Sequence, residues 1–302
     1  SGGYRVLEWI SGGGGTLNLA PNLNHEDPVL RKIIEDRRFR IALSYAINRN
    51  EINEVGYFGL GKPMQNCPPS TSPYYVPEFE SAYTEYNPDK ANALLDEMGL
   101  DKRNARGVRL RPDGKPLQLF IDVPAMIGNL QLLELVAEYW EAVGVNVQIK
   151  VEAAQSLNVS RTLNEHDARA GYQGGSETGE YTTGGVEPIT CNRARGIGPD
   201  ARQMPCGTDA GWGWKWGRWL AAQAAIDAGT HTLADFGGEM PGEEPPEAVK
   251  ELDRLSEVLP TTEFGSAKYV ETASSIYELQ AENLWVRGVG GESSELYIRN
   301  RD

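Results

Sequence analysis

"RRFRIALSYAINRNEI", residues 37–52, combines the apolar spacing of a core helix with an arginine-rich start. Its apolar side chains recur at i, i+3, i+4, i+7 and i+8, which is one helical face: Phe39, Ala42, Leu43, Ala46 and Ile47. Arg40, Ser44 and Asn48 fall on the opposite face. The stretch is therefore predicted to be a helix packed on a core, after which Asn48 or Asn50 caps a further short helix.

The arginines of this stretch raise the question of an anion site, and the charge of the whole chain argues against one. The 302 residues include 29 Lys and Arg against 43 Asp and Glu, a net charge of −14. Such a surface repels phosphate backbones, so nucleic-acid binding is disfavoured. We expect the arginines to pair with neighbouring acids such as Glu35 and Asp36, or with the protein's own surface.

Toward the N-terminus, residues 4–10 and 16–20 are predicted strands separated by a Gly-rich turn. A helix is expected next, with Asp27 as its N-cap and Pro28 at its first position. The first residues have neither the charged nor the apolar segment of a signal peptide, so the chain is either cytosolic or derived from an exported precursor. No apolar run in the sequence approaches the length of a membrane span.

Toward the C-terminus, residues 62–86 are predicted to be a long loop, and Asn87 to cap a helix that Gly99 ends. Strand 117–123, helix 129–143 and strand 145–151 form a βαβ unit, which implies a parallel strand pair with a right-handed crossover. The remaining segments are predicted as helix 156–165, strand 168–175, polar loop 174–211, Trp-rich helix 212–228, a helix after residue 246, helix 266–283 and two terminal strands. This order predicts an α/β fold with a mixed sheet.

Familiar cofactor and metal motifs are weak in this sequence. "GYFGLGKP" (56–63) nearly matches a phosphate-binding P-loop, but Pro63 replaces the hydroxyl residue and forbids the helix that should begin there. Cys191 and Cys206 flank a Gly- and Pro-rich loop and either form a disulfide or remain thiols, whereas Cys67 is left unpaired. No metal and no cofactor are expected, because the histidines lie far apart in the sequence: His25, His166 and His231.

The loop "YQGGSETGEYTTGG", residues 172–185, is the first candidate for a ligand site. Its glycines let the backbone approach a ligand closely, and Glu177, Glu180 and Tyr181 supply polar groups. A surface loop with no ligand is the alternative.

Four tryptophans follow this polar region. Trp212, Trp216 and Trp219 share a helical face, and Trp214 points elsewhere. Aromatic side chains at the edge of a polar loop suit sugar or peptide contact, so Trp212 and Trp214 are candidate ligand contacts. The alternative is that these rings belong to the core.

Carboxylate pairs motivate a different class of function, a secreted carbohydrate-active hydrolase. "GEEPPE" (242–247) would serve such an enzyme only if its acids faced another carboxylate across a sugar cleft. The simpler account is that Pro245 and Pro246 begin a helix with acids at its positive end.

Several runs, in order, resemble one known family. They are "RRFRIALSYAINRNEINEVGYFGLGKP", "YNPDKANALLDEMGL", "PDGKPLQLFI", "ELVAEYWEAVGVNVQIKV" and "NEHDARAGYQGG", spread over roughly residues 16–175. The sequence is similar here to the extracellular solute-binding proteins of family 5, the peptide-, nickel- and oligosaccharide-binding components of ABC importers. The likeness thins from residue 176 to 265 and returns with the last helix and "ENLWVRGVG".

The resemblance implies a non-enzymatic protein of periplasmic-binding-protein type II fold, with two lobes that close on a solute and deliver it to a membrane permease. Family members are considerably longer, so the chain is expected to be the C-terminal lobe. Residues 1–26 would then be strand stubs and the outward hinge crossing, 27–283 the second lobe, and 284–302 the return crossing. The resemblance also implies a periplasmic or extracellular location, with a lipoprotein anchor possible in the full-length form, and a monomer.

The resemblance further implies which residues line the cleft, because in the family the strand near "GYQGGS" and the loop after it do so. By position the expected contacts are Tyr172, Gln173, Gly174, Gly175, Ser176, Glu177 and Tyr181. Peptide binders often place an acid near this point to meet the amino terminus of the ligand, a part that Glu177 could play. The local pattern departs from that of dipeptide binders, so both a peptide and an oligosaccharide are expected ligand classes.

Overall fold

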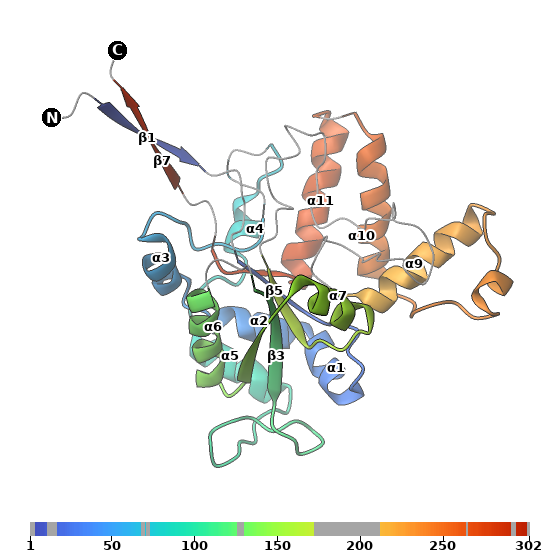
Figure 1. Cartoon of the computed structure of the whole chain (residues 1–302), viewed down its shortest axis with the longest axis horizontal. Coiled ribbons are helices and arrows are strands. Elements are labelled where there is room, and N and C mark those ends of the chain that lie inside the picture. The colour runs from blue at the N-terminus through green and yellow to red at the C-terminus, as the bar shows by residue number, and fades with distance from the viewer. Residues whose placement is uncertain are drawn as a thin grey trace.

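A mixed five-stranded sheet forms the centre of the protein. The computed structural model describes residues 4–10, 17–67, 70, 73–125, 130–171, 212–263, 265–290 and 294–300. The sheet has the strand order β4-β3-β5-β2-β6. Its strands are β2 (Asn18–Pro21), β3 (Gln118–Pro124), β4 (Asn146–Glu152), β5 (Ala168–Gly171) and β6 (Arg287–Gly288). Helices flank this sheet (Figure 1), so the predicted α/β class with a mixed sheet is confirmed.

The opening stretch forms helix α2 (Arg37–Tyr45), between α1 (Pro28–Glu35) and α3 (Arg49–Tyr57). The five apolar side chains of its predicted core face are at most 1% exposed. Asn48 caps α3 by accepting from the N–H of Glu51, as expected. The opposite face is also covered, since Arg40 and Ser44 are buried.

The arginines of this stretch bind local oxygen atoms. Arg38 pairs with Asp36 at 2.7 Å, as predicted, and Arg37 donates to the Tyr83 hydroxyl at 2.7 Å. Arg40 donates instead to backbone carbonyls, those of Ile34 and Glu35 at the end of α1 and of Asn283 at the end of the last helix. Its role is therefore to satisfy helix ends, which otherwise leave their last carbonyls without partners.

The predicted βαβ unit is present. β3 and β4 pair in parallel over their full lengths, and α6 (Leu130–Ala142) connects them. α6 buries Leu132, Leu133, Val136 and Trp140, and the indole N–H of Trp140 donates to the carbonyl of Leu43 on α2 at 3.0 Å. β5 is parallel to β3, whereas β2 runs antiparallel to both β5 and β6.

The first and last strands stand apart from this sheet. β1 (Tyr4–Ile10) does not pair with β2; it pairs antiparallel with β7 (Ser294–Asn300) in a two-stranded sheet. Figure 1 shows this ribbon projecting away from the five-stranded sheet, with both termini at its far end. The chain thus enters the body of the protein after β1 and leaves it before β7, through two paired strands.

The other helices complete the layers around the sheet. They are α4 (Pro77–Ser81), α5 (Pro88–Glu97), α7 (Ala154–Thr162), α9 (Trp214–Asp227), η3 (Leu233–Phe236), α10 (Glu247–Val258), η4 (Leu259–Thr261) and α11 (Ala267–Asn283). Asn87 caps α5, and Gly99 follows with the positive φ of 78° that ends a helix, as predicted. α10 and α11 lie side by side (Figure 1). Within the described residues, no helix has both the length and the apolarity needed to cross a membrane.

Candidate functional site

The edge of the sheet at which β3 and β5 end is the place to look for a ligand, because open α/β sheets bind ligands at the carboxyl ends of parallel strands. β5 ends here at Gly171, which pairs with Asn18 at the start of β2. Gly288 at the end of β6 also pairs with Asn18. Two of the strands that meet here, β2 and β6, are the ones that lead to the β1–β7 ribbon in sequence.

Asn18 is a polar residue that the sequence analysis missed. Its side chain is only 4% exposed, and neither amide atom has a hydrogen-bond partner among the described residues. Buried amides normally have partners, because an unpaired one costs about 1–3 kcal/mol. Nothing in the local sequence "TLNLA" distinguishes this asparagine from a solvent-facing one, which explains why it was missed.

Most of the residues predicted to contact ligand lie outside the described part of the chain. These are Tyr172, Gln173, Gly174, Gly175, Ser176, Glu177 and Tyr181, together with the cysteines of the proposed disulfide, Cys191 and Cys206. The described part fixes only where this segment begins and returns. It begins after Gly171 at the carboxyl edge, and it returns at Trp212, whose carbonyl accepts from the N–H of Leu23 at 2.8 Å.

Trp212 and Trp214, the two remaining predicted contacts, are buried. The ring of Trp212 stacks on Trp285 at 5.0 Å and 8° and meets Trp216 edge-on at 6.1 Å. Leu23 follows the end of β2 opposite to Asn18, so Trp212 lies toward the other edge of the sheet from Gly171. The core alternative accounts for these contacts of Trp212, and a ligand role for Trp212 and Trp214 stays a prediction.

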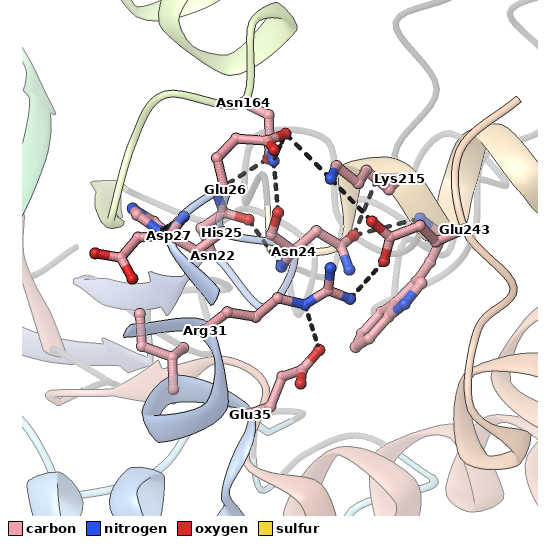
Figure 2. A network of polar contacts seen from close by, with 12 residues as sticks. Asn22, Asn24, His25, Glu26, Asp27, Arg31, Glu35, Asn164, Lys215 and Glu243 are labelled. Atoms are coloured by element: carbon pink, nitrogen blue, oxygen red, sulfur yellow. Dashed lines mark hydrogen bonds and ion pairs between the residues drawn. The ribbon is translucent and has the colours of Figure 1, made fainter. Parts of the chain in front are cut away.

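A network of asparagines joins the end of β2 to α9 (Figure 2). The amide of Asn22 donates to Asn164 Oδ1 at 3.0 Å and to the carbonyl of His166 at 2.9 Å. Asn24 Oδ1 accepts from the backbone N–H groups of Lys215 and Trp216 at 2.9 and 3.3 Å. Asn24 therefore caps α9 from a position 191 residues away in sequence.

Charged side chains extend this network (Figure 2). Lys215 pairs with Glu26 at 3.1 Å and with Glu243 at 2.8 Å, and Arg31 pairs with Glu243 at 2.6 Å and Glu35 at 2.8 Å. The bond from Arg31 lowers the pKa of Glu243, and the bond from Asn164 lowers the pKa of Glu26. These ion pairs hold α1, α9 and the segment before α10 together, which is a structural role.

His25 forms hydrogen bonds in the same region and is not part of a metal site among the described residues. Its Nδ1 accepts from the N–H of Asp27, so Nε2 donates to Asp167 at 2.9 Å. Asp167 in turn accepts from the N–H of Phe120 on β3. Among the described residues, no group of three or more His, Cys, Asp and Glu side chains could hold a metal ion.

Asp27 links the start of α1 to Arg111. Its carboxylate accepts from the N–H groups of Val29 and Leu30, as the predicted N-cap should, and from Arg111 Nη2 at 2.6 Å. Burial alone would raise the pKa of this carboxyl, but Arg111 and the two backbone donors outweigh burial and lower the pKa from 3.8 to about 2.

The charge on Asp27 makes a testable contribution to acid stability. Because its pKa is lower in the folded protein, the stability it adds is present above about pH 4 and is lost as the pH falls through about 2. Asp27→Asn keeps an oxygen acceptor for the helix N-cap but removes the charge. The variant is expected to melt at a lower temperature than wild type at pH 6, and the two melting curves should converge near pH 2. A difference in melting temperature that stays constant from pH 6 to pH 2 would contradict this assignment.

A pocket of about 530 Å³ lies between β3, β4 and α7. Asp122 is buried in its wall and accepts from Ser160 Oγ at 3.1 Å, and burial raises the pKa of this carboxyl. The rest of its lining is Lys150, Glu152, Gln155, Ser156, Val159 and Glu165. Neither Trp212 nor Trp214, the two predicted ligand contacts within the described residues, lines this pocket.

Comparison with known proteins decides the family. The model of the bacterial extracellular solute-binding proteins, family 5 Middle, matches residues 4–181, more than half of the chain. The chain belongs to family 5 of the bacterial extracellular solute-binding proteins. The resemblance found in the sequence is thereby confirmed, and so is the periplasmic-binding-protein type II fold.

Individual relatives of this family 5 chain support the assignment. The dipeptide-binding protein of Escherichia coli (strain K12) is 33% identical over 121 residues, which is 40% of this chain and 21% of that protein. A solved oligopeptide-binding protein OppA is 33% identical with a TM-score of 0.79, and the match covers 99% of this chain and 44% of that one. A protein solved with stachyose, MelB from Agrobacterium fabrum C58, has a TM-score of 0.66 at 15% identity, covering 99% of this chain and 40% of that one, and shares the fold. The chain thus spans less than half the length of these relatives.

Family membership also decides between the two classes of function considered from the sequence. The proteins of family 5 are substrate-binding proteins of ABC importers, located in the periplasm or outside the cell, and are not enzymes. The acids of "GEEPPE" have structural roles in this chain, since Glu243 pairs with Arg31 and Lys215, and Glu244 and Glu247 pair with Lys250. The hydrolase alternative is therefore not retained.

Proposed function

We propose that this chain is the second lobe of a two-lobed protein that captures peptides outside the cytoplasm and delivers them to an ABC permease. The observation that carries the proposal is the match to a solved oligopeptide-binding protein over 99% of this chain but only 44% of that protein. In this account the ligand binds at the carboxyl edge of the sheet, between this lobe and a first lobe, and no bond is broken.

The strand arrangement supports a hinge at this edge. β2 and β6 lie side by side in the sheet, and both lead toward the β1–β7 ribbon. Residues 1–26 and 284–302 would contain the outward and return crossings, and residues 27–283 the body of the lobe. A pair of adjacent crossing strands is an arrangement about which a lobe can rotate as a rigid body.

A peptide is the ligand class that the comparisons favour. The relatives at 33% identity are named for dipeptides and oligopeptides, whereas the relative solved with stachyose is 15% identical and supports only the fold. Trp212, one of the two tryptophans considered as sugar or peptide contacts, stacks on Trp285 inside the core. Peptide binding is therefore proposed in preference to oligosaccharide binding.

The proposed contacts on this lobe are the loop residues predicted from the sequence and Asn18. Tyr172, Gln173, Gly174, Gly175, Ser176, Glu177 and Tyr181 follow directly after β5, which ends beside Asn18. The Asn18 amide offers both a donor and an acceptor, which matches the two polar groups of a peptide bond. Glu177 is proposed to meet the amino terminus of the peptide as a charge-assisted hydrogen-bond acceptor.

Calorimetric titration of the complete two-lobed protein proposed above, called the longer protein below, tests the ligand class. Peptides of two to six residues are expected to bind, and oligosaccharides of similar size to give no heat of binding. Glu177→Gln is expected to weaken binding of peptides with a free amino terminus about tenfold, equivalent to 1.4 kcal/mol, and to leave N-acetylated peptides unaffected. Binding of oligosaccharides without peptides would overturn the proposed ligand class.

A further inference from the structure

The C-terminal end of α3 presents apolar side chains to solvent. We call this feature the Phe58 turn, and it consists of Val55, Phe58 and Leu60. Their exposed fractions are 41%, 84% and 45%. A single exposed apolar residue needs no explanation, but three of them on one short turn indicate an interaction surface.

The backbone of Phe58 is strained. Phe58 caps α3 in the left-handed conformation with φ 54°, which a bulky residue adopts only at a cost. Asn or Gly would occupy this position more favourably. Since the ring of Phe58 is almost fully exposed, packing within this chain does not offset the strain.

The turn is nevertheless held in one conformation. Asn53 accepts from the N–H of Gly59 with its carbonyl, at 3.1 Å, and from the N–H of Gly61 with its Oδ1, at 2.9 Å. Gly56, two residues before Phe58, lies so close to Leu132 of α6 that an added Cβ would be 2.6 Å from that side chain. α3 is therefore pressed against α6, and the ring of Phe58 is presented on a rigid support.

The position of the turn identifies what it would contact. A methyl group built on Gly290 would lie 3.7 Å from Cε2 of Tyr57, so the end of α3 touches the segment that joins β6 to the ribbon. Figure 1 shows α3 beside the base of the β1–β7 ribbon, on the opposite side of the molecule from α9. The Phe58 turn thus borders the edge at which the first lobe is proposed to attach.

We propose that the Phe58 turn is an apolar latch that docks on the first lobe when the two lobes close. This inference rests on the function proposed above and names a contact that holds the closed state. Transfer of the phenylalanine side chain out of water is expected to shift the balance between open and closed states at least tenfold. In this proposal the contact of the Phe58 ring with the first lobe in the closed state offsets the backbone strain at Phe58.

The test uses the longer protein with peptide as the ligand. Phe58→Asn suits the left-handed backbone and removes the apolar ring, so its melting temperature should equal or exceed that of wild type. It is expected to bind peptide about tenfold more weakly than wild type, mainly through faster dissociation, and to contract less on adding peptide in small-angle X-ray scattering. Phe58→Leu should restore most of the affinity.

The matched control is Leu233→Asn, which also replaces an exposed apolar side chain by asparagine. Leu233 is 44% exposed and lies on η3, after α9. Its affinity for peptide should equal that of wild type. Unchanged affinity and contraction in Phe58→Asn would overturn the latch. Normal peptide binding with lost uptake in cells would also overturn it and would assign the turn to a membrane partner. A wild-type protein that binds no peptide would instead refute the proposed function, and the latch with it.

Discussion

Replacement of Trp212 by alanine is expected to lower the free energy of unfolding by about 3–5 kcal/mol, the usual cost of removing a large buried aromatic side chain. Trp212 is fully buried and lies between Trp285, stacked at 5.0 Å, and Trp216, edge-on at 6.1 Å. Its loss would leave a cavity at the point where the chain returns from residues 172–211 to the end of β2. Urea unfolding followed by tryptophan fluorescence or circular dichroism measures the change.

Two further variants separate packing from ligand contact at this position. Trp212→Phe keeps an aromatic ring to stack on Trp285 and should cost much less than Trp212→Ala. Trp219→Ala removes a partly buried ring of α9, the helix that follows Trp212, and should cost about 1–2 kcal/mol, since less apolar area is lost. If Trp212→Ala unfolds like wild type but no longer binds peptide, Trp212 is a ligand contact and the core interpretation is wrong.

Local sequence signals predicted much of this fold. The apolar period of the opening stretch gave α2 and its core face, because a helix that packs on a sheet must repeat its apolar residues every three to four positions. Asp27 and Asn87 were predicted as N-caps, and Asn48 as one of two candidates with Asn50, because such residues supply acceptors for the first N–H groups of a helix. The apolar strands on both sides of α6 gave the parallel pair β3–β4.

Contacts between residues distant in sequence were not predicted. The two strands on either side of the Gly-rich turn were predicted without a pairing partner, and β1 pairs with β7, almost three hundred residues later. Pairing partners of a strand depend on which edges the fold brings together, and one strand's residue pattern does not specify them. Asn24 likewise caps α9 across 191 residues, and no local motif marks it as a cap.

Only part of the candidate site was predicted, because its residues too are brought together by contacts between strands distant in sequence. The loop after β5 was proposed as a ligand contact through its glycines and the family resemblance, and this stays a prediction. Asn18 was not proposed, because only the pairing of β2 with β5 and β6 places it at this edge. Trp212 and Trp214 were nominated by their aromatic character alone. Aromatic residues serve cores as readily as ligand sites, so composition could not separate the two.

The proposed division of the ligand site between two lobes has a large expected effect on affinity. A peptide held between two lobes loses about half of its contacts when one lobe is absent, and closure can no longer exclude water from it. Residues 1–302 alone are therefore expected to bind peptide roughly 100-fold more weakly than the longer protein, or not measurably. The chain has its own extensive core, so it is expected to remain folded in this experiment.

The most direct test of this account is isothermal titration of one peptide into two proteins, the longer protein and residues 1–302 alone. Circular dichroism of residues 1–302 should first confirm a cooperative unfolding transition. The account predicts clear peptide binding by the longer protein and a loss of about two orders of magnitude or more in the isolated chain. Equal affinity of the two proteins for the peptide would contradict it, because the complete site would then lie within these 302 residues.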